Sequence, residues 1–270
     1  MSAQIFIAPE EITDHLQQPG QVIVDLCKPE SYQKAHIPGA IYMDYAAIIR
    51  HEKPIMGLPP AESDFSHVLE QSGISPDTHV VAYDDEGGGR AGRLLWTLAM
   101  AGHQKFSLID GGLHAWIAKG LPTSDKIEQP TPSHYPVTYS NPDVSADRQY
   151  ILANLNNPDI VILDARSAVE FSGEKAFAAR GGHIPGAINY DWTNAMDQNN
   201  ALQMRPPHAI LTELAELGIN PDKEIIVHCQ THHRSAYSYW MLKALGFDKV
   251  RGYPGSWSDW GNHPDTPIEK

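Results

Sequence analysis

The sequence contains an internal repeat, and this repeat constrains the fold more than any other feature. The hexapeptide His-Ile-Pro-Gly-Ala-Ile occurs twice, at residues 36–41 and again at 183–188. Three further pairs of blocks recur in the same order: 22–25 with 161–164, Asp44 with Asp191, and 73–77 with 218–222. Because an ordered series of matching blocks marks repeated structural units, we predict two copies of one fold in tandem.

A proline-rich segment separates the two copies. Residues 129–142 contain four prolines and show little apolar periodicity. Proline fixes φ and removes a backbone donor, so this segment is expected to be an extended linker. The chain length of 270 residues suits two ordinary domains. We therefore predict domains at 1–128 and 143–270, with a linker at 129–142.

Both halves alternate short apolar runs with helical patterns. In the second half, residues 160–163 and 225–227 are typical of buried strands, and residues 236–245 show a helical pattern. In the first half, the apolar run 80–82 precedes a helical pattern over about 90–101. Such alternation predicts an α/β fold in each half, with a small parallel sheet covered by helices on both faces. Ligands of such sheets bind at the carboxyl ends of the strands.

One strand-loop-helix unit in the second half carries reactive residues. Cys229 stands at the carboxyl end of the strand predicted at 225–227. The residues that follow it are polar: Gln230, Thr231, His232, His233, Arg234 and Ser235. The backbone N–H groups of such a turn and the helix N-terminus stabilise an anion, and Arg234 adds positive charge. We therefore predict that Cys229 has a lowered pKa and is a nucleophilic thiolate at neutral pH.

Composition and charge exclude several other classes of protein. The formal net charge of −13 at pH 7 argues against nucleic acid and against an anionic membrane surface as partners. No apolar run is long enough to cross a bilayer and the N-terminus lacks a signal-peptide pattern, so a cytoplasmic location is predicted. The two cysteines form neither a disulfide framework nor a zinc-binding pair. Cys27 is expected to be an inert packed thiol.

Together these motifs resemble the rhodanese superfamily over essentially the whole chain. The resemblance rests on the repeated His-Ile-Pro-Gly-Ala, the strand-cysteine-loop-helix unit, and an Asp-Gly-Gly with a tryptophan near the end of the first half. The loop Cys-Gln-Thr-His-His-Arg at 229–234 is similar to that of a bacterial thiosulfate:cyanide sulfurtransferase subgroup.

The resemblance implies an activity and its partners. Cys229 would carry sulfur as a persulfide from thiosulfate to a thiophilic acceptor, which is cyanide in vitro and a thiol or a protein in the cell. Neither a metal nor an organic cofactor is implied. The resemblance also implies that only the second domain is catalytic, and two internally packed halves favour a monomer.

The first half lacks the catalytic cysteine. Aligning 80–83 with 225–228 places Asp84 at the position of Cys229, and a carboxylate cannot carry sulfane sulfur. We therefore expect the first domain to be a degenerate, catalytically inactive partner. A solvated turn is a better interpretation of the acidic residues around Asp84 than a cation site.

Two other functions fit the same cysteine. In a Cys-based phosphatase the thiolate would attack a phosphoryl group. Phosphatases related to this fold have a Cys-x5-Arg loop, however, and Cys229 to Arg234 is one residue shorter. The smaller loop favours a terminal persulfide sulfur. The other alternative is a sulfur-carrier or binding module for a partner protein, with negligible turnover of small molecules.

The roles of several charged residues outside the loop stay open at this level. Arg166 lies just after the strand predicted at 160–163 and either contacts the sulfonate of thiosulfate or pairs with a neighbouring carboxylate. The family often has a second substrate arginine four residues later, where this chain has Glu170. Arg180 is either its substitute or a surface residue.

The histidines have two expected roles. His36 and His183 recur in both halves, so we expect them to anchor structure rather than to catalyse. His232 and His233 are adjacent and point in different directions, so anion contact or acceptor selection is favoured over metal binding.

Overall fold

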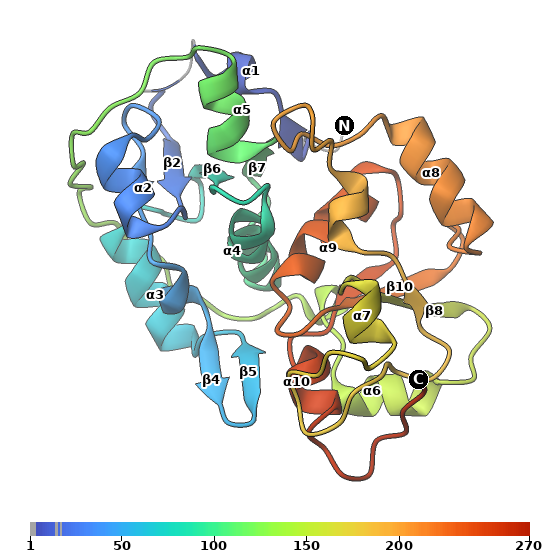
Figure 1. Ribbon diagram of the computed structural model, residues 1–270. Coiled ribbons are helices and arrows are strands. Elements are labelled where there is room, and N and C mark those ends of the chain that lie inside the picture. The colour runs from blue at the N-terminus through green and yellow to red at the C-terminus, as the bar shows by residue number, and fades with distance from the viewer. Residues whose placement is uncertain (1–3, 14–15, 17) are drawn as a thin grey trace. The chain divides into compact units, whose positions relative to one another are not determined.

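The computed structural model describes residues 4–13, 16 and 18–270, and the chain forms two compact units (Figure 1). The first unit consists of Met1–Ile48, Pro60–Asn141 and Met196–Met204. The second consists of Ile49–Pro59, Pro142–Ala195 and Arg205–Lys270. Each half of the sequence therefore supplies one short segment to the unit formed mainly by the other half.

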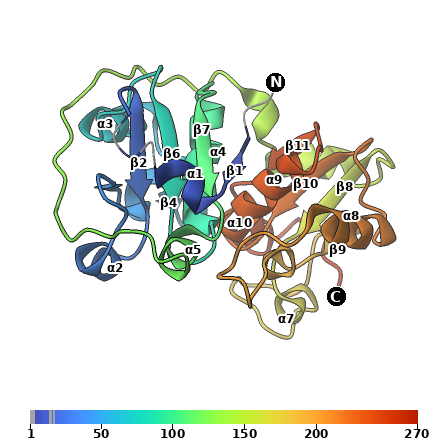
Figure 2. The same cartoon turned by 90° about the horizontal axis from the view of Figure 1, so that it is seen from above.

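The sheet of the first unit contains five parallel strands in the order β1-β7-β6-β2-β3 (Figure 2). These strands are β1 (Phe6–Ile7), β2 (Gln21–Asp25), β3 (Ile41–Tyr42), β6 (His79–Tyr83) and β7 (Phe106–Ile109). The helices are α1 (Pro9–Thr13), α2 (Pro29–Lys34), α3 (Glu62–Gln71), α4 (Gly89–Met100) and α5 (Gly112–Ala118), with a 3-10 turn at Tyr45–Ile48.

Alternation along β6 divides this unit into layers. Val81 and Tyr83 belong to a buried cluster with residues of α1 and α5, including Trp116. Successive side chains of a strand point to opposite faces, so Val80 and Ala82 face the other layer, where α4 packs on β6 and β7. Helices therefore cover both faces of the sheet.

The second unit repeats this plan with four parallel strands in the order β11-β10-β8-β9. The strands are β8 (Ile160–Asp164), β9 (Ile188–Asn189), β10 (Glu224–His228) and β11 (Val250–Gly252). The helices are α6 (Arg148–Asn154), α7 (Ala168–Phe171), α8 (Pro207–Glu216), α9 (Arg234–Ala244) and α10 (Ser256–Trp260), with 3-10 turns at Pro142–Val144 and Trp192–Ala195. An antiparallel hairpin, β4 (Arg50–Glu52) and β5 (Ile55–Leu58), belongs to the same unit.

The core of the second unit also has two layers. Ile162 and Ile226 pack with residues of α6 and with the α10 tryptophans Trp257 and Trp260. Helix α9 lies against β10 and β11. The predicted α/β class, with a parallel sheet covered by helices in each half, is confirmed. The helix predicted at 236–245 begins two residues earlier, at Arg234.

The predicted domain limits differ from the compact units. The proline-rich segment is extended but packs on the first unit as far as Asn141. There, Ser133 N–H donates to the Glu70 carbonyl at 2.9 Å and the Tyr139 hydroxyl donates to the Pro60 carbonyl at 2.8 Å. Residues 49–59 and 196–204 each belong to the unit formed mainly by the other half of the sequence, and their apolar periodicity does not predict this.

Within the described residues, no helix is long and apolar enough to cross a membrane.

Candidate active site

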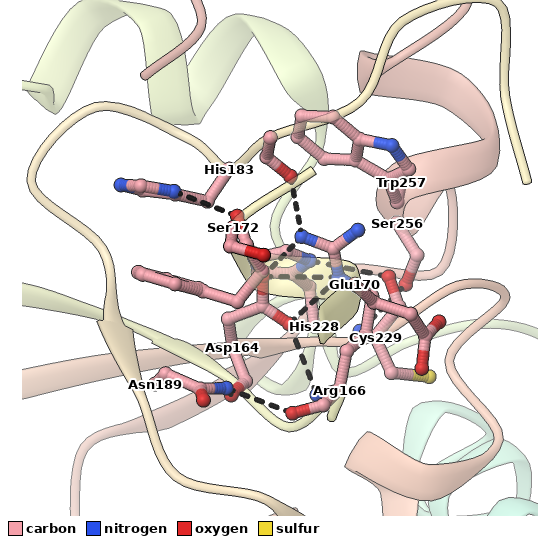
Figure 3. Close-up of polar contacts among 12 residues, drawn as sticks. Asp164, Arg166, Glu170, Ser172, His183, Asn189, His228, Cys229, Ser256 and Trp257 are labelled. Carbon is pink, nitrogen blue, oxygen red and sulfur yellow. Dashed lines mark hydrogen bonds and ion pairs between the residues drawn. The ribbon is translucent and has the colours of Figure 1, made fainter. Parts of the chain in front are cut away.

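Cys229 lies at the carboxyl end of β10, one of the two inner strands of its sheet. Parallel pairing aligns His228 with Asp164 of β8, so the cysteine emerges at the edge of the sheet where ligands of such folds bind. The loop 229–233 then leads into α9, which begins at Arg234. His232 adopts a φ of +55°, a left-handed conformation that is uncommon outside glycine and lets the loop curl tightly. The Cys229 side chain, drawn in Figure 3, is fully buried.

Helix α10 holds the outer side of this loop. The backbone N–H groups of Trp257 and Ser258 donate to the carbonyls of Cys229 and Gln230, each at 3.0 Å. The Cys229 N–H donates to the Ser256 hydroxyl at 3.3 Å. Because these carbonyls are turned toward α10, N–H groups farther along the loop can face the sulfur. The result is a concave backbone site for an anion.

The electrostatics of this site favour the Cys229 thiolate. Burial raises the pKa of the thiol, but the Arg234 charge, the Ser235 hydroxyl and N–H, and the Thr231 N–H outweigh burial and lower the pKa to about 7. Charged groups and hydrogen bonds of this kind stabilise the charged form of a thiol. A large fraction of Cys229 is therefore thiolate at neutral pH.

Arg234 is fixed by a carboxylate that sequence reasoning did not place in the site. Its two terminal nitrogens form a bidentate ion pair with Glu170, at 2.7 Å and 2.8 Å. Glu170 is buried and also closes a capping box at the start of α7 with Ser167. Burial raises the pKa of Glu170, but the Arg234 guanidinium and the Ser167 hydrogen bonds lower it to about 2. The ion pair therefore holds the guanidinium that stabilises the thiolate.

The Glu170 pairing predicts a specific pH dependence of stability. The folded-state pKa lies below the ordinary value, so the pair stabilises the fold above about pH 4.5 and loses this contribution as the pH falls toward 2. Glu170→Gln is expected to lower the free energy of unfolding by about 2 kcal/mol at pH 7. Urea unfolding should show the difference from wild type shrinking between about pH 5 and pH 2. Glu174→Gln, at an exposed position, is the control, and a difference for Glu170→Gln that stays constant with pH would contradict this role.

Arg166 forms the salt bridge that was one of its two expected roles. Its side chain is 1% exposed, and its Nε lies 2.9 Å and 3.0 Å from the two carboxylate oxygens of Asp164. A terminal nitrogen donates to the Gly182 carbonyl at 2.8 Å, and the guanidinium stacks 4.4 Å above the ring centre of Trp257 (Figure 3). A strand-end arginine has the same sequence pattern whether its side chain faces solvent or folds back on its own strand, so the sequence left both roles open.

Arg180 and the two repeated histidines also have structural contacts. The Arg180 guanidinium donates to the carbonyls of Trp260, His263 and Thr266, which fixes the C-terminal segment. His183 stacks on Phe171 with ring centres 3.7 Å apart, and Nδ1 of His36 lies 2.6 Å from the Tyr32 carbonyl oxygen. These contacts agree with the anchoring role expected for both histidines.

The remaining side chains of the cysteine loop have two kinds of position. Some are buried and stabilise the loop, and others lie at its more exposed side. Nδ1 of His232 lies 2.8 Å from the Ser235 hydroxyl, and both residues are buried. The Gln230 amide donates to the Phe177 carbonyl at 3.2 Å. His233 is only partly buried, with its ring centre 6.0 Å from that of Trp192. His232 therefore positions Ser235, while His233 lies at the more open side of the loop.

In the first unit the Asp84 carboxylate fills the position that corresponds to the Cys229 sulfur, so the expectation of a solvated turn is wrong for Asp84. The Asp84 carboxylate is fully buried and accepts backbone N–H groups at 2.8–3.0 Å from four residues: Glu86, Gly88, Arg90 and Ala91. Burial and the nearby Glu86 charge raise its pKa above the ordinary value, although the hydrogen bonds from the N–H groups of Ala91, Glu86 and Gly88 act in the opposite direction. The Glu86 and Arg90 N–H groups stand two and six residues after Asp84, the same spacing that the Thr231 and Ser235 N–H groups have after Cys229. Cys27, at the end of β2, is buried and its pKa is raised by burial and by Asp25.

The fold and the site together define a protein with two copies of one α/β unit, of which the second holds a thiolate in a backbone anion site. A model of the rhodanese-like domain matches the chain twice, at residues 8–119 and 147–263. The chain belongs to the rhodanese-like domain family.

Curated relatives match the chain over nearly its whole length. A thiosulfate sulfurtransferase of Azotobacter vinelandii is 45% identical over 99% of this chain and 98% of its own. A thiosulfate sulfurtransferase of Pseudomonas aeruginosa is 43% identical over 98% and 97%. The sulfur carrier protein TtuD of Thermus thermophilus is 30% identical over 99% and 97%.

Solved structures share the fold at lower identity. The anaerobic ergothioneine biosynthesis enzyme from Chlorobium limicola, in complex with trimethyl histidine, superposes with a TM-score of 0.88 at 23% identity. The match covers 100% of this chain and 71% of that chain. It supports the tandem architecture described above.

Proposed function

We propose that this protein is a thiosulfate sulfurtransferase that carries the transferred sulfur as a persulfide on Cys229. The observation that carries the proposal is the Cys229 site itself, a buried sulfur surrounded by N–H donors, a hydroxyl and a fixed arginine, with a pKa of about 7. The names of the Azotobacter vinelandii and Pseudomonas aeruginosa relatives support thiosulfate as the donor.

The reaction consists of two displacements on sulfur. The Cys229 thiolate attacks the outer sulfur of thiosulfate, a new S–S bond forms, and the original S–S bond breaks as sulfite leaves with its electron pair. Cyanide or a thiolate then attacks the outer sulfur of the Cys229 persulfide. That sulfur leaves as thiocyanate or as a new persulfide, and the Cys229 thiolate is restored.

The site is suited to both anionic states of this cycle. The thiolate and the terminal persulfide sulfur each carry one negative charge, and the N–H groups of Thr231 and Ser235 are already oriented toward it. Donors that need no reorganisation in a buried site stabilise developing charge effectively. Both terminal nitrogens of Arg234 are bound to Glu170, so the arginine acts as a fixed neighbouring charge. A phosphoryl group would need a freer arginine and a wider loop, so this geometry favours sulfur over phosphate.

The first half-reaction should depend on the ionisation of Cys229. Its rate is expected to rise with pH and level off above about pH 7, because only the thiolate attacks. Below the midpoint it should fall about tenfold per pH unit. Stopped-flow release of sulfite across this range measures the midpoint. Ser235→Ala removes a hydroxyl that lowers the pKa, so its midpoint should move upward; an unchanged midpoint would contradict the assigned role of Ser235.

Steady-state kinetics test the proposed function as a whole. Thiocyanate formation at varied thiosulfate and cyanide concentrations should give parallel double-reciprocal lines, because sulfite leaves before the acceptor binds. Intersecting lines would contradict a persulfide intermediate. Failure of thiosulfate as a donor, together with turnover of a phosphoryl ester, would favour a phosphatase.

A second candidate, a sulfur carrier for a partner protein, is favoured by the 30% identity to TtuD. Under this alternative the Cys229 persulfide forms and is passed to a protein thiol, while turnover with cyanide is negligible. Our proposal includes thiols and proteins as acceptors in the cell and requires no metal or organic cofactor. The cytoplasmic location and the monomeric state stay predictions.

A further inference from the structure

The β4–β5 hairpin comes from the first half of the sequence but belongs to the compact unit that contains Cys229. Its strands pair antiparallel, with Arg50 opposite Leu58 and Glu52 opposite Ile55. Strand β5 packs on α10, the helix that binds the outer carbonyls of the cysteine loop. The corresponding segment of the second half, 196–204, forms only an isolated bridge and belongs to the other unit.

Gly57 of β5 lies in direct contact with the cysteine loop. A Cβ atom at this position would lie 2.2 Å from the Thr231 carbonyl oxygen and 2.7 Å from that of Pro254. Gly57 is not one of the glycines with positive φ, so the requirement for glycine comes from space and not from backbone conformation. Both obstacles are backbone atoms, which cannot rotate away as a side chain can. Any larger residue must therefore move the hairpin or the loop.

A hydrogen-bonded connection reinforces this contact. The Met56 N–H donates to the Ser258 hydroxyl at 3.1 Å, and the Ser258 N–H donates to the Gln230 carbonyl at 3.0 Å. Ser258 is buried. The hairpin therefore contacts the cysteine loop at two adjacent peptide groups. It contacts Thr231 directly, and it is connected to Gln230 through Ser258. The Thr231 N–H, which lies between them, is one of the donors to the Cys229 sulfur.

From this geometry we propose that the β4–β5 hairpin positions the N–H groups that stabilise the anionic sulfur, with Gly57 as the residue that permits the close approach. The inference deepens the proposed function, since the same site holds the persulfide. Gly57 and Ser258 are positioning residues: they touch the loop and not the substrate. A segment from the catalytically inactive half of the sequence thereby positions the loop that contains Cys229.

The test compares the ionisation of Cys229 in variants of the full-length protein. Thiolate absorbance is titrated against pH, with the Cys229→Ala form of each variant as the blank. Gly57→Ala should raise the midpoint by about one pH unit, the size expected from weakening one hydrogen bond to an anion. Gly112→Ala is the control for general destabilisation, because its Cβ would lie 2.3 Å from the Asp84 carbonyl oxygen in the first unit and its φ is +54°. It should destabilise the fold and leave the Cys229 midpoint unchanged.

Ser258→Ala tests the proposed role of the hairpin if Gly57→Ala does not fold. This variant removes the acceptor of the Met56 N–H but keeps the Ser258 N–H bond to Gln230, and its midpoint should also move upward. Folded variants with the wild-type midpoint would overturn the proposal, as would an equal shift in Gly112→Ala. The titration needs no sulfur donor. A shifted midpoint in a protein inactive with thiosulfate would therefore reject the proposed function and keep the role of the hairpin.

Discussion

Cys229→Ala is expected to lower the rate of sulfur transfer from thiosulfate to cyanide by at least about a thousandfold, because no other group in the site can hold the sulfur. The fold should be retained. Cys229 is followed by a loop whose carbonyls are bound to α10 through backbone N–H groups, and these bonds do not need the sulfur. Thiocyanate formation and the circular dichroism spectrum measure the two properties together.

Cys27→Ala is the matched control for this variant. Cys27 also follows a buried strand, but burial and Asp25 raise its pKa, so it is a thiol and not a thiolate at neutral pH. Its removal should leave the transfer rate within about twofold of wild type. Residual transfer in Cys229→Ala that disappears only when Cys27 is also replaced would contradict the assignment of the reaction to Cys229.

The largest effect on stability is expected for Asp84→Ala. The substitution removes a carboxylate that accepts four backbone N–H groups in a buried loop. Unpaired buried donors cost about 1–3 kcal/mol each. Even with water entering part of the space, the free energy of unfolding should fall by at least about 3 kcal/mol. Asp84→Asn retains one acceptor oxygen and should recover part of the loss.

Asp77→Ala is the control for Asp84→Ala. Asp77 pairs with Lys105 at 3.1 Å, but its side chain is 94% exposed, and such surface pairs contribute little to stability. Urea unfolding monitored by tryptophan fluorescence compares the two variants. Equal and small losses for both would show that Asp84 is a solvated turn residue and not the internal anion of the first unit.

Much of the architecture could be predicted because it is local or repeated. The recurrence of His-Ile-Pro-Gly-Ala-Ile required two similar units, and the apolar runs at 160–163 and 225–227 required a buried parallel sheet. The position of Cys229 followed from the same pattern, since a residue after a strand must lie at the sheet edge. The alignment of Asp84 with Cys229 likewise anticipated a carboxylate in the equivalent loop.

Most of the missed features depend on contacts between distant parts of the sequence. Glu170 and Arg234 are 64 residues apart, so their ion pair has no sequence pattern; the glutamate was noted only as a departure from a family arginine. The hairpin 50–58 carries no sign that it packs beside Thr231 except Gly57, and one glycine in a strand has several explanations. Arg166 pairs with Asp164 only two residues away, but its burial could not be read from spacing.

The intact mass of the protein is the most direct test of the persulfide on Cys229. Purified wild-type protein, Cys229→Ala and Cys27→Ala are each weighed by mass spectrometry after thiosulfate and again after cyanide. Wild type and Cys27→Ala should gain the mass of one sulfur atom with thiosulfate and lose it with cyanide, while Cys229→Ala should gain none. A wild-type protein with reduced Cys229 that gains no sulfur, or a Cys229→Ala variant that gains as much as wild type, would contradict the proposed function.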